Sequence, residues 1–410
     1  MNRLFVFLLL LSAGCSVNQN PFSQNRASAY QFPQNRFLSG IDFFSLDEHH
    51  VRVEIKIAGR QLAFLPDLEG EKPRRRFVIR ASFYSEFKRR KPVIIPPIII
   101  ESADTDESIE FIARLKIPLS LGHEGLLKIE ARDLQNKKGV IIYKNLSRKV
   151  IDSALDFRVQ QKGISNFQGW IHEGTPVQIS FWDSTETDFI MTEFHVFKQL
   201  PLPPFSLDDS PKDDFQAVSR TNIQKATLDS FVINKEKILR ISSSKHSENG
   251  LILSVVEQDF PSLPEKDGAF ESHLFLMQKK EKQNNTSKNI TEFWAMIGLN
   301  SLQIQSIEKA WSDRIKQTNM LFTAYILGWR TDRGMIYTIF GAPNTVYNNG
   351  KAEEWNYISS KGKPPLTFRF ERCSNIFSHE EYCLVRKSEY ATYWYKAIET
   401  WRNGTPYTYE

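Results

Sequence analysis

The chain has 410 residues, of which 41% are hydrophobic, 25% charged and 12% aromatic. These proportions are typical of a folded protein of two to four domains and exclude a disordered, collagen-like or low-complexity chain. Its longest apolar runs fall short of the roughly 18 residues of a membrane-spanning helix, which excludes a polytopic membrane protein. A net charge of +5 is small for this length and gives little indication of an anionic partner.

The first fifteen residues are typical of an export signal. Arg3 precedes the apolar residues 4–11, and small residues from Ser12 onward lead to Cys15. The segment resembles the lipobox of bacterial lipoproteins, in which the cysteine is acylated and the signal is removed. It departs from that pattern in having Ser12 where leucine is commonest. The alternative is an ordinary secretory signal followed by a chance cysteine.

Acylation of Cys15 implies a stable membrane anchor, because several fatty chains together hold a protein to a bilayer. We therefore expect a signal peptide over residues 1–14 and a flexible tether over residues 15–37, which are rich in Asn, Gln, Ser and Arg. Surface-exported lipoproteins of Bacteroidota usually carry acidic residues just after the cysteine, and residues 16–20 have none. This favours the periplasmic face of the outer membrane.

Residues 38–160 have the pattern of a β-sandwich. Residues 51–57 alternate strictly between apolar and polar side chains, and residues 61–64 could pair with them as a hairpin. Further runs occur at residues 76–87, 109–117, 126–131 and 140–143. About seven strands in 120 residues indicate an immunoglobulin-like sandwich, with a barrel as the alternative.

Residues 163–278 repeat this pattern and predict a second β domain. Its expected strands are residues 177–182, 189–197, 231–241, 250–256 and 272–277. The Pro-rich residues 200–205 and the acidic residues 208–214 are expected to form an exposed loop. The polar residues 279–289 are expected to be a linker.

Residues 290–410 predict an α+β domain. One helical face repeats at intervals of three and four, in Ile304, Ile307, Trp311, Ile315, Thr318, Phe322 and Tyr325. We expect that helix to end at Gly328, with Trp329 folding back on its last turn. Strands are expected at residues 335–340, 353–358, 366–371 and 382–386, followed by a helix from Tyr390 to about Trp401.

Residues 328–334, with the sequence Gly-Trp-Arg-Thr-Asp-Arg-Gly, resemble the signature of the GWxTD-domain family of exported proteins, common in Bacteroidota. Supporting matches follow in the Gly341–Pro343 turn, in a strand with Trp355 and in the closing Trp-Arg-Asn-Gly of residues 401–404. The resemblance covers about residues 290–405. It implies an exported protein of this domain plan and implies no reaction.

The same motif can be interpreted physically as a corner between a helix and a strand. Gly328 and Gly334 would allow positive φ angles, and Trp329 would fill the angle. Thr331 or Asp332 would accept backbone hydrogen bonds. Either Arg330 or Arg333 would pair with Asp332 or with a carboxylate across the domain, such as Glu354. The alternative is that Asp332 and Arg333 line a cleft and contact a ligand or partner.

Apart from Cys15, the cysteines are Cys373 and Cys383. In an oxidising compartment this spacing predicts a disulfide between neighbouring strands. The alternative is a metal site with His379 and Glu380, but such closely spaced ligands match no common zinc pattern. We therefore expect neither a metal nor a cofactor.

Two basic clusters flank an expected strand, and both are candidate contacts with lipid headgroups or an acidic partner. They are Arg74, Arg75 and Arg76, and Lys88, Arg89, Arg90 and Lys91. The alternative is a charged edge strand protected from aggregation. The adjacent residues 92–100 are either an exposed apolar docking strip or an edge strand guarded by prolines.

Searches for catalytic motifs of hydrolases, zinc enzymes and nucleotide-binding proteins find none in the sequence. We therefore expect a non-enzymatic lipoprotein that serves an outer-membrane assembly, secretion or transport complex as a scaffold subunit, with no nucleic-acid partner. The alternative is a surface carbohydrate- or peptide-binding lipoprotein that uses aromatic residues such as Trp170 and Trp182. A hydrolase would require clustered carboxylates around a pocket.

Overall fold

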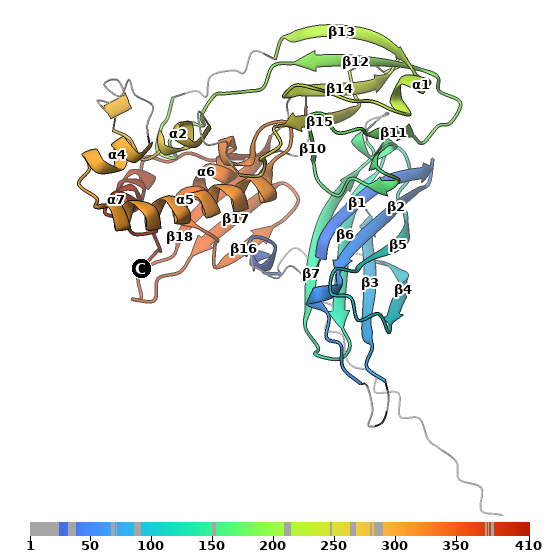
Figure 1. Cartoon of the computed structure of the whole chain (residues 1–410), viewed down its shortest axis with the longest axis horizontal. Helices are drawn as coiled ribbons and strands as arrows, with labels where there is room; N and C mark the ends of the chain where they lie inside the picture. Colours follow the sequence, from blue (N-terminus) through green and yellow to red (C-terminus); the bar gives the residue numbers. More distant parts are fainter. Residues whose placement is uncertain are drawn as a thin grey trace, which may run out of the picture.

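A computed structural model describes residues 24–31, 38–66, 70, 72–85, 92–149, 153–208, 215–246, 248–262, 268–278, 281–282, 290–373, 375, 377–378 and 381–410. The fold is mainly β with an α+β part at the C-terminal end, as predicted, and the strands of these residues form five sheets. An N-terminal β-sandwich stands below a second β-rich unit, and the helical C-terminal domain lies beside them (Figure 1). None of the helices described is long and apolar enough to cross a membrane.

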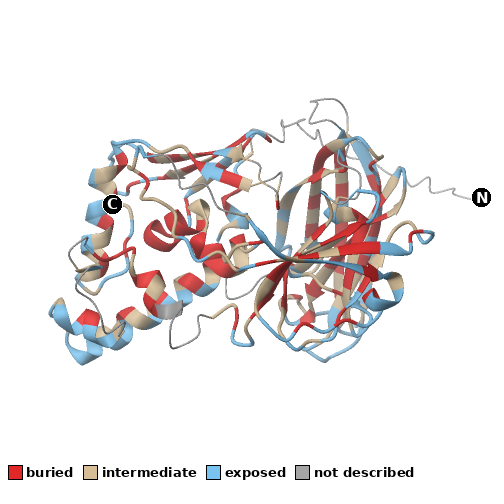
Figure 2. Cartoon of the chain, turned by 90° about the horizontal axis from the view of Figure 1, so that it is seen from above, coloured by how far each residue is buried: buried red, intermediate tan, exposed pale blue. Residues whose placement is uncertain are grey.

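The N-terminal sandwich has the predicted number of strands. Its strands are β1 (Leu38–Asp47), β2 (His50–Ala58), β3 (Arg75–Ser85), β4 (Val93–Ser102), β5 (Glu110–Pro118), β6 (Glu124–Asp133) and β7 (Gly139–Ser147). They form two antiparallel sheets, with orders β1-β2-β5 and β4-β3-β6-β7. Inward side chains alternate with outward ones, so that buried positions stripe the strands in Figure 2.

The predicted hairpin within residues 51–64 is wrong. β2 pairs with β1 and β5, and residues 59–61 form the short 3-10 helix η3 (Gly59–Gln61). The two-residue turn between Asp47 and His50 makes the hairpin on the other side of β2. The alternation in β2 is nevertheless real, since Val51, Val53, Ile55 and Ile57 are fully buried.

The second β unit consists of a three-stranded and a five-stranded sheet. Its elements are η4 (Ala154–Asp156), β8 (Phe157–Gln161), β9 (Ile164–Ser165), β10 (Trp170–His172), β11 (Gln178–Phe181), β12 (Asp188–Phe194), β13 (Ala217–Gln224), α1 (Lys225–Leu228), β14 (Lys237–Ser243) and β15 (Leu251–Val256). The sheet orders are β11-β8-β9 and β10-β15-β14-β12-β13, in which β10 joins β15 in parallel.

The predicted strand at residues 272–277 is wrong. Residues up to His273 belong to helix α2 (Gly268–His273), and Phe275, Leu276 and Met277 enter the core of the C-terminal domain. A short apolar run satisfies either a helix or a strand, and here the neighbouring core decides its conformation.

The C-terminal domain packs helices against an antiparallel sheet of order β16-β17-β18-β19. Its further elements are α4 (Ile290–Met296), α5 (Ser301–Phe322), η5 (Gly328–Arg330), α6 (Asp332–Phe340), β16 (Thr345–Asn348), β17 (Ala352–Tyr357), β18 (Leu366–Cys373), β19 (Glu381–Leu384) and α7 (Tyr390–Arg402). The predicted face of α5 is the buried one, but the helix ends at Phe322, earlier than predicted, because Thr323 is extended.

The predicted strand at residues 335–340 is also wrong, because these residues form most of α6. Thr331 caps the helix, and Gly334 and every residue from Met335 to Phe340 are buried. A helix that is buried on all sides has no amphipathic period, so its β-branched and aromatic residues resemble a strand in the sequence.

Aromatic side chains hold the C-terminal domain against the second β unit. Phe377 lies between Phe194 of β12, with ring centroids 4.7 Å apart, and Tyr325, with centroids 4.9 Å apart. Phe197 and Phe215 complete this cluster. The two units are therefore joined by a packed interface as well as by the chain.

Candidate functional site

Some of the predicted site residues lie outside the described residues. These are Cys15 and the second basic cluster, Lys88, Arg89, Arg90 and Lys91, together with His379 and Glu380. Their predicted roles remain predictions. The signal peptide and most of the predicted 279–289 linker also fall outside the described part of the chain.

The two glycines of the 328–334 motif allow backbones to approach closely. A Cβ atom on Gly328 would lie 2.3 Å from the carbonyl oxygen of Thr318 in α5. A Cβ atom on Gly334 would lie 1.8 Å from the carbonyl oxygen of Gly328. Neither glycine has a positive φ angle, so the predicted role in left-handed backbone is wrong. Both are required by contact between η5, α5 and α6.

Thr331 and Asp332 fix the start of α6. The Thr331 hydroxyl donates to the Gly328 carbonyl at 2.7 Å and accepts from the Gly334 amide at 2.9 Å, which is an N-cap. Asp332 accepts from the Leu384 amide of β19 at 2.7 Å and pairs with both terminal nitrogens of Arg386, at 2.6 and 3.2 Å. Burial raises the pKa of Asp332, and Arg386 opposes that shift.

Trp329 and Arg330 pack the motif against α2. Trp329 is fully buried with its ring against Phe275, and the Arg330 guanidinium lies 4.3 Å from the centre of that indole. Arg330 also pairs with Glu271 and donates to the carbonyl of Lys198, in the segment that leads away from the second β unit. Arg330 therefore pairs with neither Asp332 nor Glu354, which differs from the prediction.

Arg333 lies on the opposite side of α6, among aromatic rings. Its guanidinium carbon is 4.9 Å from the Tyr382 ring centre and 5.3 Å from that of Phe322. Its carboxylate partner is Glu353, at 3.8 Å, rather than the predicted Glu354. Glu353 is buried and accepts from the indole nitrogen of Trp355 at 2.7 Å, which gives this motif tryptophan a fixed position.

The Gly341–Pro343 turn closes α6. Gly341 has a φ of 85°, and its amide donates to the Tyr337 carbonyl. Its own carbonyl accepts from the Tyr357 hydroxyl at 2.8 Å. A positive φ favours glycine at this helix end, so the turn after the motif has a structural basis.

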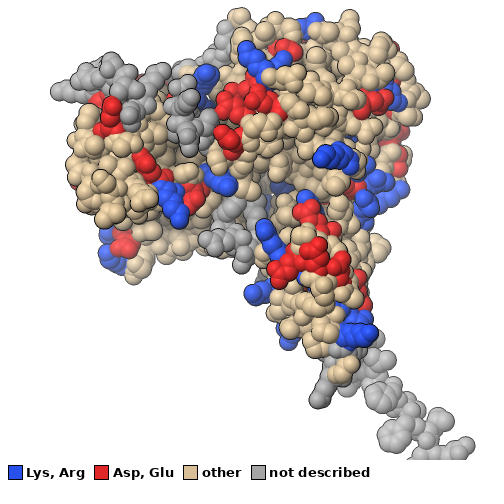
Figure 3. Space-filling model, in the orientation of Figure 1, with Lys and Arg blue, Asp and Glu red and all other residues tan. Residues whose placement is uncertain are grey.

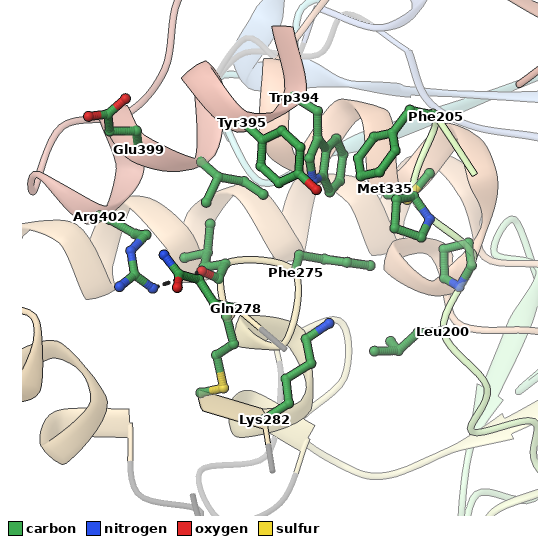
Figure 4. A pocket seen from close by; sticks show the side chains of 15 residues that line it. Leu200, Phe205, Phe275, Gln278, Lys282, Met335, Trp394, Tyr395, Glu399 and Arg402 are labelled. Atoms are coloured by element: carbon green, nitrogen blue, oxygen red, sulfur yellow. Dashed lines mark hydrogen bonds between the residues drawn. The ribbon is translucent and has the colours of Figure 1, made fainter. Parts of the chain in front are cut away.

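An apolar pocket of about 810 Å³ adjoins the motif helix. Four stretches of the chain line it: residues 200–205, residues 275–278 with Lys282, Met335 of α6, and α7. Phe205, Phe275, Met335 and Trp394 face this cavity in Figure 4. Of the motif helix, Met335 reaches the lining, whereas Asp332 and Arg333 do not.

Charged groups of both signs surround the pocket. Arg402 lies in its lining and pairs with Glu281 at 2.7 Å, while Lys282 and Glu399 contribute further polar ends (Figure 4). Burial lowers the pKa of the Lys282 ammonium. Tyr395 is 59% exposed, with its ring 5.2 Å from that of Phe205. The pocket thus has an apolar floor and a mixed polar rim.

The Pro-rich residues 200–205 of the predicted exposed loop cover α7 instead, so this part of the prediction is wrong. Pro204 is buried, and its carbonyl accepts from the Lys387 amide at 3.0 Å, next to α7. Leu202 likewise accepts from Arg386 at 3.2 Å. The apolar composition of this Pro-rich stretch was the available signal of packing, since solvated loops carry more polar side chains.

The first basic cluster is largely paired within the chain. Arg74 and Arg76 pair with Glu101 at 3.4 and 2.8 Å, and Arg75 is buried, with its guanidinium 5.0 Å from the Phe64 ring centre. β3 lies inside its sheet, so it is not the charged edge strand of the prediction. In Figure 3, basic and acidic side chains are interspersed over the visible face of the sandwich.

One edge of that sheet is β4, which contains the apolar residues 93–100. Two prolines interrupt its pairing with β3 at a register shift between Ile79 and Ala81. Ile94 and Ile99 are nevertheless 67% and 58% exposed. The strand therefore combines both predicted features, since it is an edge guarded by prolines and an exposed apolar strip.

Cys373 and Cys383 form the predicted disulfide across β18 and β19. Among the described residues, no group of three or more His, Cys, Asp or Glu side chains is placed to hold a metal ion.

Trp170 is buried against Phe260, so it is not the exposed aromatic that the carbohydrate-binding alternative requires. Trp182 is half-buried beside Phe181.

Replacing both cysteines by serine should lower the free energy of unfolding by about 3 kcal/mol, because the loop between them regains its freedom in the unfolded chain. Urea unfolding followed by tryptophan fluorescence measures this, since six of the eight tryptophans lie between Trp294 and Trp401. The unaltered protein in reductant should show the same loss. A change below about 0.5 kcal/mol would contradict the expectation.

Comparison with known proteins identifies one region of the chain. Residues 237–403 match the family model of the GWxTD domain. The matched region begins with β14, in the five-stranded sheet, and ends just after α7, so it includes the motif, the pocket walls from Phe275 to Arg402 and the disulfide. A search of curated protein sequences finds no match.

Proposed function

Residues 237–403 of the chain are a GWxTD domain. From this premise we propose that the protein is a non-enzymatic binding subunit whose pocket between residues 275–278 and α7 receives an apolar segment of a protein partner. We propose further that the protein is a lipoprotein, anchored through Cys15 to the periplasmic face of the outer membrane, in an assembly, secretion or transport complex. The export signal and lipobox pattern support the anchor.

The pocket is the observation that carries this proposal. Its volume of about 810 Å³ and its floor of Phe275, Met335 and Trp394 suit several apolar side chains. The polar rim, with Tyr395 exposed at its mouth, has the composition of a protein interface, in which aromatic and polar residues surround an apolar centre. Trp329 of the family motif packs against Phe275, so the motif supports the floor of the pocket through contacts inside the domain.

A substitution that introduces a charge at the mouth of the pocket tests whether the pocket binds the partner. Tyr395→Glu should reduce partner recovery at least tenfold, because an apolar segment would have to desolvate the new carboxylate. Tyr395 is mostly exposed, so the change should leave the fold intact. The measurement is a mild-detergent pull-down of the tagged protein from its native membrane, with mass spectrometry of the proteins that co-purify.

The matched control is Leu302→Glu, at a residue of α5 that is 79% exposed and does not line the pocket. It should recover the partner as the unaltered protein does. Recovery of the unaltered protein alone, from membranes in which other complexes stay intact, would refute the proposal. Equal recovery by the two variants would refute the assignment of the pocket.

A further inference from the structure

Residues 24–31, which belong to the predicted flexible tether, are docked on the C-terminal domain. The Arg26 amide donates to the carbonyl of Val346 in β16 at 2.7 Å. The Asn25 side chain accepts from the Val346 amide and from the Ala27 amide, both at 2.9 Å. Since β16 is an edge strand, the segment satisfies the amide and carbonyl of Val346 that the sheet leaves unpaired.

Tyr30 anchors the other end of this segment, after the 3-10 turn η2 (Ala27–Ala29). Its ring lies 5.0 Å from that of Trp355 and 5.8 Å from that of Phe322. Its hydroxyl donates to Glu353 at 2.7 Å, and its carbonyl accepts from the Tyr337 hydroxyl at 3.0 Å. Burial next to Glu353 raises the pKa of Tyr30 well above its usual value, so this phenol remains a donor.

Glu353 is therefore a shared acceptor at the base of the Tyr30 site. It also accepts from Trp355 and, at 2.9 Å, from the Asn348 side chain, and Arg333 lies 3.8 Å away. Glu353 and Asn348 are buried, at 3% and 5% exposure. A buried carboxylate makes strong, charge-assisted hydrogen bonds, and the tyrosine hydroxyl donates one of them.

The segment also contacts the N-terminal sandwich. The buried guanidinium of Arg26 lies 4.5 Å from the ring centre of Tyr143 in β7, and the Tyr143 hydroxyl donates to the Gln24 side chain. η2 lies against both β7 and β16. The segment thus connects two units that are far apart along the chain.

We propose that β16, Glu353 and the surrounding aromatic rings form a peptide-binding site specific for a short segment with a 3-10 turn and a tyrosine anchor. Its occupant is the chain's own segment 24–31, so the tether is bound in place. If Cys15 carries the anchor, as the proposed function holds, nine residues lead from the lipid to Gln24. At about 3.3–3.6 Å per residue, the docked segment stays within about 30 Å of the membrane.

The test uses the full-length protein with a specific protease site inserted after Gln34, so that cleavage leaves the N-terminal fragment held only by its non-covalent contacts. Size-exclusion chromatography in detergent then measures whether the fragment remains with the body of the protein. We expect retention in the unaltered protein and loss with Tyr30→Ala. Tyr30→Phe keeps the ring but leaves Glu353 without its donor, so it should bind about tenfold more weakly.

The matched control is Ser28→Ala, at an exposed position of the same segment, which should be retained like the unaltered fragment. A labelled synthetic peptide of residues 24–31 should rebind to the fragment-depleted protein. Release of the unaltered fragment as complete as with Tyr30→Ala, with circular dichroism unchanged, would overturn the proposal. The assay contains no partner, so its outcome is independent of whether the pocket binds one.

Discussion

Replacing Gly334 with alanine should destabilise the C-terminal domain by at least 4 kcal/mol. The new Cβ would lie 1.8 Å from the Gly328 carbonyl oxygen and 2.9 Å from the Thr318 side chain, and the first of these is backbone that cannot rotate away. Helix propensity predicts the opposite sign, because alanine is favoured over glycine by about 1 kcal/mol inside a helix. The sign of the change therefore separates backbone contact from propensity.

Urea unfolding of the full-length protein measures this loss, with tryptophan fluorescence as the probe of the C-terminal domain. Gly362→Ala is the matched control in the same domain, because its Cβ would meet no heavy atom within 4 Å although its φ is 72°. It should cost only about 1 kcal/mol, for the left-handed backbone. If Gly334→Ala were as stable as Gly362→Ala, the close contact of η5 with α6 would not be a requirement of the fold.

The sequence predicted elements that bury one face and missed those that do not. β2, α5 and α7 each have a buried stripe whose period is visible in the residues, and each was predicted at its place in the chain, although α5 ends earlier than predicted. α6 is buried on all sides, so its residues showed no helical period and were interpreted as a strand. The motif residues were singled out by family resemblance, but their partners lie later in the chain, Glu353 in β17 and Arg386 just after β19.

The two candidate binding sites could not be predicted for a different reason. The pocket takes its walls from stretches of the chain between Leu200 and Arg402, and nothing in any one stretch marks it. The docked segment is polar in composition and resembles a linker, because its attachment depends on a few hydrogen bonds of its backbone and of Asn25, and on the one large ring of Tyr30. The composition of a segment predicts how buried its residues are on average. It does not reveal that one anchored residue can hold a short peptide in place.

Replacing Asp332 with alanine should cost about 3–5 kcal/mol, since it leaves a mostly buried guanidinium without its partner. Asp332 and Arg386 are 12% and 14% exposed, and they form a two-pronged pair that also holds the Leu384 amide. Asp332 thus fixes the start of α6 to β19. Urea unfolding of the full-length protein, monitored by tryptophan fluorescence, measures the loss.

A second variant distinguishes loss of the pair from simple damage to the helix start. Asp332→Ala combined with Arg386→Met removes the uncompensated charge, so the double variant should be more stable than Asp332→Ala alone by about 1 kcal/mol or more. Lys361→Met breaks an ion pair with Glu410 whose side chains are 65% and 55% exposed, and it should cost less than about 1 kcal/mol. Strictly additive losses in the double variant would show that Asp332 acts on α6 without Arg386. Recovery in the double variant would instead identify the charge pair between α6 and β19 as the reason why the motif requires an aspartate at this position.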